Sequence, residues 1–132
     1  MYLKRKFCFL IMALCYSVLA YADGIPSDSG TLRISFAKPL NEIPLHKIVD
    51  ADFSISTPQG APVPGLQFDV EAGMPGHGHG MPTFPFVEER SNGHYTLRGV
   101  SFSMRGEWLL VMMIKNGRSS SDRFTLPINI TP

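Results

Sequence analysis

The sequence predicts an all-β protein: an immunoglobulin-like antiparallel β-sandwich of about seven strands, preceded by a signal-peptide helix. Short segments alternate apolar and polar residues with a period of two, as half-buried strands do. Clusters of Gly, Pro, Asn and Ser separate these segments at short intervals. After the N-terminal segment no stretch sustains a 3.6-residue apolar period, so helices should be minor. A small β-barrel is the alternative that this pattern leaves open.

The expected strands follow one another along the whole chain. Asn116-Gly117 is a strong hairpin signal between the last two of them. In the last strand Pro127 falls on the polar face, which indicates an edge strand because proline has no N–H to donate to a neighbour. Trp108 is the expected anchor of the core. The strands are expected at residues 31–37, 48–56, 66–71, 94–102, 107–114 and 123–130, with another starting near Phe84.

The first 22 residues are organised like a secretory signal peptide. Basic residues 4–6 precede an uncharged apolar run at residues 7–20, and a small-x-small site, Ala-Tyr-Ala, ends at Ala22. We expect cleavage there, then a flexible lead-in over residues 23–30 and one β-sandwich domain over residues 31–132. A retained membrane anchor is the alternative, although a spanning helix needs about 20 apolar residues and this run is shorter. The protein is therefore expected in the periplasm or outside the cell.

Cysteine usage and charge exclude several classes of function. Both cysteines, Cys8 and Cys15, lie in the N-terminal segment, and neither follows the small residue that a lipoprotein site requires. The exported part then has no disulfide and no thiolate ligand. Three of the 12 basic residues also lie in that segment, which leaves nine against 11 acidic residues. This balance does not favour nucleic acid, or direct membrane contact other than through an uncleaved signal or a partner.

Residues 73–85 depart from the strand pattern. Their glycines and prolines predict a loop between a strand ending near Ala72 and the one starting near Phe84. The loop holds the series Met74-x-x-His77-x-His79-x-Met81. Residues two apart in an extended chain point the same way, so His77 and His79 can converge on one point between the two methionines.

This set of donors favours copper. Thioethers are soft ligands that prefer Cu(I), and imidazoles bind Cu(I), Cu(II) and Zn(II). We therefore expect Cu(I) in preference to Cu(II), with zinc a weaker candidate because the loop contains no acidic residue. In the simpler alternative, Met74 and Met81 pack beneath a Gly/Pro loop and the two histidines are incidental.

Other methionines and histidines give weaker signals. Met104, between two strands, is either a further thioether ligand or a turn-packing residue. Met112 and Met113 are expected to pack in the core. His46 and His94 are expected at the surface or at a strand start. The chain has no Gly-x-Ser-x-Gly, phosphate-binding glycine loop or HExxH pattern, so we do not expect an enzyme.

Two blocks of residues resemble the YtkA-like domain proteins, which are related to the FixH-like proteins. The first block is Met74-Pro75-Gly76-His77-Gly78-His79-Gly80-Met81-Pro82-Thr83, with Pro85. The second is Gly93-x-Tyr95-x-Leu97-x-Gly99-Val100-x-Phe102-x-Met104-x-Gly106-x-Trp108-x-Leu110. The resemblance covers roughly residues 31–130. It implies an exported or membrane-anchored sandwich with the Met/His loop at one end and a role in copper handling or respiratory-oxidase maturation. The ligands that it implies are Met74, His77, His79, Met81 and Met104.

Two hypotheses follow. In the first, an exported protein carries or buffers Cu(I) for a membrane copper transporter or an oxidase assembly factor. In the second, the protein is a metal-independent interaction or accessory module of a membrane complex, which it contacts through the apolar Met and Phe side chains of residues 73–85.

Overall fold

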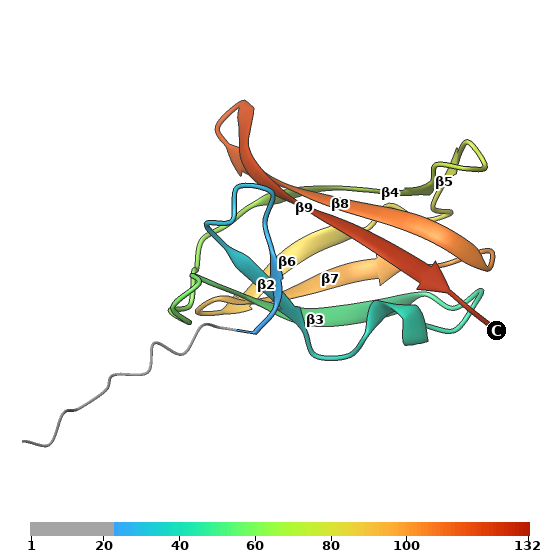
Figure 1. Cartoon of the computed structure of the whole chain (residues 1–132), viewed down its shortest axis with the longest axis horizontal. Helices are drawn as coiled ribbons and strands as arrows, with labels where there is room; N and C mark the ends of the chain where they lie inside the picture. Colours follow the sequence, from blue (N-terminus) through green and yellow to red (C-terminus); the bar gives the residue numbers. More distant parts are fainter. Residues whose placement is uncertain (1–22) are drawn as a thin grey trace, which may run out of the picture.

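The computed structural model describes residues 23–132, which form two antiparallel β-sheets packed face to face (Figure 1). One sheet has the strand order β1-β2-β3-β7-β6 and the other β5-β4-β8-β9. The strands are β1 (Ile25–Pro26), β2 (Arg33–Phe36), β3 (Val49–Ser56), β4 (Phe68–Met74), β5 (His79–Gly80), β6 (Phe86–Ser91), β7 (His94–Val100), β8 (Gly106–Asn116) and β9 (Ser119–Ile130). A single-turn 3-10 helix, η1 (Leu40–Glu42), follows β2. The predicted all-β sandwich is confirmed.

Strands β8 and β9 show why the sequence alternates. Every second residue faces the other sheet and is buried, while the residues between them are exposed or half-buried. Burial of these apolar side chains holds the two sheets together. The buried residues are Trp108, Leu110, Met112 and Ile114 of β8 and Phe124, Leu126, Ile128 and Ile130 of β9.

The turn between β8 and β9 lies where the sequence predicts it. Gly117 and Arg118 connect the strands, between the paired residues Asn116 and Ser119, and Gly117 has a φ of 64°, a conformation that favours glycine. Strand β9 forms an edge of its sheet, and its Pro127 pairs with Leu109 of the one neighbouring strand, β8. The predicted hairpin and the predicted edge strand are both confirmed.

Strand β7 lies between β3 and β6 in the five-stranded sheet. Near its start, Tyr95 stacks on Phe53 with ring centroids 5.4 Å apart and donates a hydrogen bond to the carbonyl oxygen of Val63 at 2.7 Å. At its other end Val100 pairs with Val49, the first residue of β3. The connection from β7 to β8 therefore leaves the sheet at the end opposite Tyr95.

Several sequence expectations differ from the structure. Residues 23–132 contain nine strands rather than about seven, because the two-residue strands β1 and β5 are too short to show a period. Strand β4 continues to Met74 instead of ending near Ala72, and β6 starts at Phe86 rather than near Phe84. Met113 is half-exposed on the outer face of β8, so only its neighbour Met112 packs in the core.

The predicted signal peptide, residues 1–22, lies outside the described residues. Over residues 23–132 the structure contains no helix of the length and apolarity required to cross a membrane.

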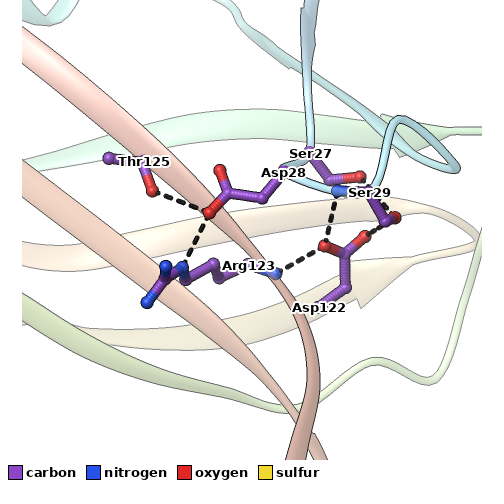
Figure 2. Close-up of polar contacts among 6 residues, drawn as sticks. All are labelled: Ser27, Asp28, Ser29, Asp122, Arg123 and Thr125. Carbon is purple, nitrogen blue, oxygen red and sulfur yellow. Dashed lines mark hydrogen bonds and ion pairs between the residues drawn. The ribbon is translucent and has the colours of Figure 1, made fainter.

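Part of the expected lead-in is attached to β9 (Figure 2). Strand β1 lies within residues 23–30, and the turn after it contacts β9 through two carboxylates. Asp122 accepts hydrogen bonds from the backbone N–H and the hydroxyl of Ser29, at 3.1 and 2.5 Å. Asp28 accepts a hydrogen bond from Arg123 at 2.7 Å. Polar contacts thus join the turn after β1 to β9, an edge strand of the other sheet.

These contacts make stability depend on the ionisation of Asp122. Burial raises the pKa of this carboxyl, but hydrogen bonds from Ser27, Ser29 and the backbone N–H groups outweigh that effect and lower its pKa from 3.8 to about 2. The ionised carboxylate therefore stabilises the fold above the unfolded value of 3.8, and that contribution is lost as the pH falls toward 2.

We expect Asp122→Asn to lower the free energy of unfolding at pH 7 by on the order of 1 kcal/mol, a value reduced for solvent screening of this partly exposed group. The difference should shrink at about pH 2.5, because the carboxyl of the unfolded chain is then almost wholly protonated and that of the folded protein has begun to protonate. Urea unfolding at both pH values measures it. Asp69→Asn, which removes an exposed ion pair with Lys115, is the control and should change stability little. A deficit of equal size at both pH values would contradict the assignment.

Candidate metal site

Residues 73–80 form a tight hairpin, which corrects the prediction that residues 73–85 are a loop without strands. The carbonyl oxygen of Met74 accepts hydrogen bonds from the N–H groups of His77 and Gly78, at 3.0 and 3.1 Å. Met74 then pairs with His79, and Gly73 with Gly80. A Cβ on Gly73 would lie 3.0 Å from the carbonyl oxygen of His79. The glycines that disfavour a long strand are therefore the residues that this reversal requires.

The hairpin places three of the candidate ligands on one face, with Met74 buried and His79 exposed. Residues paired directly across antiparallel strands project to the same side, so Met74 and His79 share a face. The N–H of Met81 donates to the carbonyl oxygen of Ala72 at 2.9 Å, which continues the pairing by two residues and puts Met81 on that face as well. Met74 is 1% exposed, and Met81 packs against the core as a partly buried residue. The two thioethers therefore point into the interior of the sandwich, at the end that carries the hairpin.

His77 lies in the turn of the hairpin and is exposed. Its ring centroid is 5.9 Å from that of His79, with the two rings tilted by 52°. Two imidazoles on one ion, each nitrogen about 2.0 Å from it, have centroids roughly 5 to 6.5 Å apart. The observed separation thus fits a shared ion.

The start of β8 lies beneath the hairpin. The terminal Cε of Met74 occupies the space beside Gly106, where a Cβ would be only 3.0 Å away. The indole of Trp108 meets the imidazole of His79 edge to face, with centroids 6.4 Å apart. On another side it meets Phe102 at 5.2 Å. Trp108 itself is 2% exposed.

The connection between β7 and β8 brings in the remaining predicted ligand. The carbonyl oxygen of Met104 accepts a hydrogen bond from Nε1 of Trp108 at 3.0 Å, and the Met104 side chain is 40% exposed. In the same connection, the N–H of Ser101 donates to the sulfur of Met81 at 3.4 Å. All five predicted ligands therefore lie at one end of the sandwich, around the hairpin and this connection.

The other two histidines, His46 and His94, lie far from each other in the fold. The backbone N–H of His46 donates to the carbonyl oxygen of Phe102 at 2.9 Å, so His46 lies near this end, with an unusual positive φ of 60°. His94 begins β7 and lies at the opposite end of that strand from Val100. The position of His46 depends on long-range contacts and could not be seen in the sequence.

The composition of this cluster limits its chemistry. Over residues 23–132 no group of three or more His, Cys, Asp or Glu side chains is placed to hold a metal ion. Two imidazoles alone are a weak site for zinc, which usually takes three or four protein ligands. An ion bound here would need the thioethers, and these soft donors prefer Cu(I).

Trp108 and Phe102 are site residues that the candidate ligand set omits. The sequence predicts Trp108 only as a core anchor, which is confirmed by its burial. The signal in the sequence that Trp108 lies at the site was its position near the start of β8, four residues after Met104. An open groove beside the hairpin is also lined by His77, Glu107 and Trp108.

Comparison with known proteins gives one match. A family model described as YtkA-like matches residues 29–112, more than half of the chain, and that range includes the hairpin, the β7–β8 connection and Trp108. Searches of the curated proteins and of the solved structures gave no match.

Proposed function

The chain belongs to the YtkA-like family, and from that premise we propose that it is an exported protein that binds Cu(I) and carries or buffers it. The observation that supports this most is the pairing of Met74 with His79 on the hairpin, together with the separation of 5.9 Å between the ring centroids of His77 and His79. A soft thioether and two imidazoles are then available at one exposed end of a rigid sandwich. This combination suits Cu(I) better than Cu(II) or zinc.

Transport or storage fits the arrangement better than catalysis. Ligands that include a buried thioether and two imidazoles fill the positions of a low-coordinate ion and leave no site for activating water. The exposed turn that carries His77 gives a partner protein access to the ion. We propose that the partner is a membrane copper transporter or an oxidase assembly factor.

Replacing one buried sulfur tests this function. We expect Met74→Leu to weaken Cu(I) binding at least about tenfold while the fold stays intact, because leucine conserves volume but has no sulfur. Competition with a chromogenic Cu(I) chelator, together with native mass spectrometry, measures affinity and stoichiometry. The original protein should bind about one Cu(I) per chain.

The matched control is Met112→Leu, which makes the same change at a methionine that is 0% exposed in β8. It should lose a similar small amount of stability and keep Cu(I) affinity. Equal affinities for the two variants would exclude Met74 as a ligand. No Cu(I) binding by the original protein would exclude the proposed function.

A second candidate function is a metal-independent interaction module, and exposed apolar side chains favour it. Phe84 is 96% exposed, Phe86 54% and Ile48 71%. Phe86 pairs with Arg98 in β7, and Ile48 precedes the residue that pairs with Val100. Phe84 follows Thr83, whose hydroxyl donates to the carbonyl oxygen of Gly99 at 2.6 Å, so the three residues lie near the same end of β7. Such a grouping is typical of a contact surface.

Partner capture separates the two candidates. If the second is correct, a membrane complex retained by the immobilised protein should survive a strong Cu(I) chelator and be lost with Phe84→Ser. If the first is correct, the chelator should release any partner that holds the ion jointly with the protein.

A further inference from the structure

Trp108 is the one tryptophan in the chain and contacts two of the candidate ligands. Its ring lies 6.4 Å from that of His79, and its Nε1–H donates to the backbone of Met104 at 3.0 Å. It also lines the groove beside His77.

We propose that the indole ring of Trp108 forms one wall of the metal site and restricts it to a low-coordinate, monovalent soft cation. The inference rests on the proposed function and names a residue that determines its specificity. Trp108 supplies no lone pair, because the indole nitrogen is a donor only and its hydrogen is already given to Met104. The ring therefore blocks one direction of approach to the ion without donating a ligand atom to it.

Geometry supports an interaction between the ring and the ion. An ion on a nitrogen of His79 lies about 3 Å from the centroid of that imidazole. Since the two ring centroids are 6.4 Å apart, an ion on the side of His79 that faces the indole can lie within about 6 Å of the indole centroid, the distance at which a cation is attracted to an indole face. Tryptophan is the strongest of the aromatic side chains in this interaction.

The hydrogen bond to Met104 and the contact with Phe102 fix the indole in place. Phe102 is 1% exposed and lies 5.2 Å from the indole at 67°, so the indole is held by a buried ring as well as by its hydrogen bond. Zinc and Cu(II) usually take four or more ligands, which include water or oxygen donors. A fixed apolar wall in one direction disfavours both and leaves Cu(I) or Ag(I) as the ions that fit.

The intrinsic fluorescence of the protein tests this proposal, because Trp108 is its single tryptophan. Ag(I) is titrated into the purified protein as a redox-inert substitute for Cu(I). We expect the tryptophan emission to be quenched progressively and to reach its end point at about one equivalent. The same titration of His77→Ala/His79→Ala should leave the emission unchanged.

Selectivity gives a second readout. Trp108→Phe keeps an apolar ring but removes the indole, and we expect the ratio of Ag(I) to Zn(II) affinity to fall about tenfold. The control is Tyr95→Phe, which removes a buried aromatic hydrogen bond near the other end of β7. It should lose comparable stability without changing the affinity ratio.

The outcomes separate this inference from the function on which it rests. One Ag(I) bound per chain by native mass spectrometry, with unchanged tryptophan emission or an unchanged affinity ratio in Trp108→Phe, would overturn the role of Trp108 alone. Failure of the original protein to bind either Ag(I) or Cu(I) would overturn the proposed function as well.

Discussion

The double variant His77→Ala/His79→Ala should lose Cu(I) affinity by at least about 100-fold, or about 2.8 kcal/mol of binding free energy. The two rings are the only imidazoles in the hairpin, and their separation of 5.9 Å fits one shared ion. Without them a bound ion would have only thioethers. Competition with a chromogenic Cu(I) chelator measures the loss.

The matched control uses the remaining histidines of the chain. His46→Ala/His94→Ala removes the same number of imidazoles, one near this end and one at the far end of β7. We expect it to retain most of the affinity. Equal affinities for the two double variants would show that the hairpin histidines do not hold the ion.

Gly106→Ala should destabilise the protein by about 2–4 kcal/mol and also weaken Cu(I) binding. Gly106 has a φ of 122°, which L-residues with a side chain rarely adopt, and an added Cβ would lie 3.0 Å from Cε of Met74. The new methyl group would push the end of the Met74 side chain aside by a few tenths of an ångström. Urea unfolding and the chelator competition measure the two effects.

Gly117→Ala controls for the backbone effect. Gly117 also has a positive φ, 64°, but an added Cβ there would meet nothing within 4 Å. We expect a cost of about 1 kcal/mol and no change in Cu(I) affinity. If the two alanine variants bind Cu(I) equally well, the packing of Met74 against Gly106 does not position a ligand.

Local chemistry explains which parts of the fold the sequence predicts. The period-two pattern of β8 and β9, the Asn116-Gly117 turn and the place of Pro127 depend on neighbouring residues alone. Strand β5 could not be predicted in the same way. Its two residues lie among glycines, and it forms because β4 supplies hydrogen-bond partners across a tight turn.

The candidate site could be predicted only in part. Spacing grouped Met74, His77, His79 and Met81, and the structure adds that Met74 is buried while His77 is exposed. That difference arises because Met74 ends β4, which is paired on both sides, whereas His77 lies in the turn; His79, in the edge strand β5, is exposed although it pairs with Met74. Trp108 joins the site through its contact with His79 of β5, a strand far from it in the sequence, so its place four residues after Met104 is a weak local signal only.

X-ray absorption at the copper edge of the Cu(I)-loaded protein tests the central claim most directly, because it identifies the atoms bound to the ion. We predict both sulfur and nitrogen neighbours, with the sulfur contribution reduced in Met74→Leu and unchanged in Met112→Leu. A spectrum with only nitrogen and oxygen neighbours, or one that Met74→Leu leaves unaltered, would contradict a thioether–imidazole site at this hairpin.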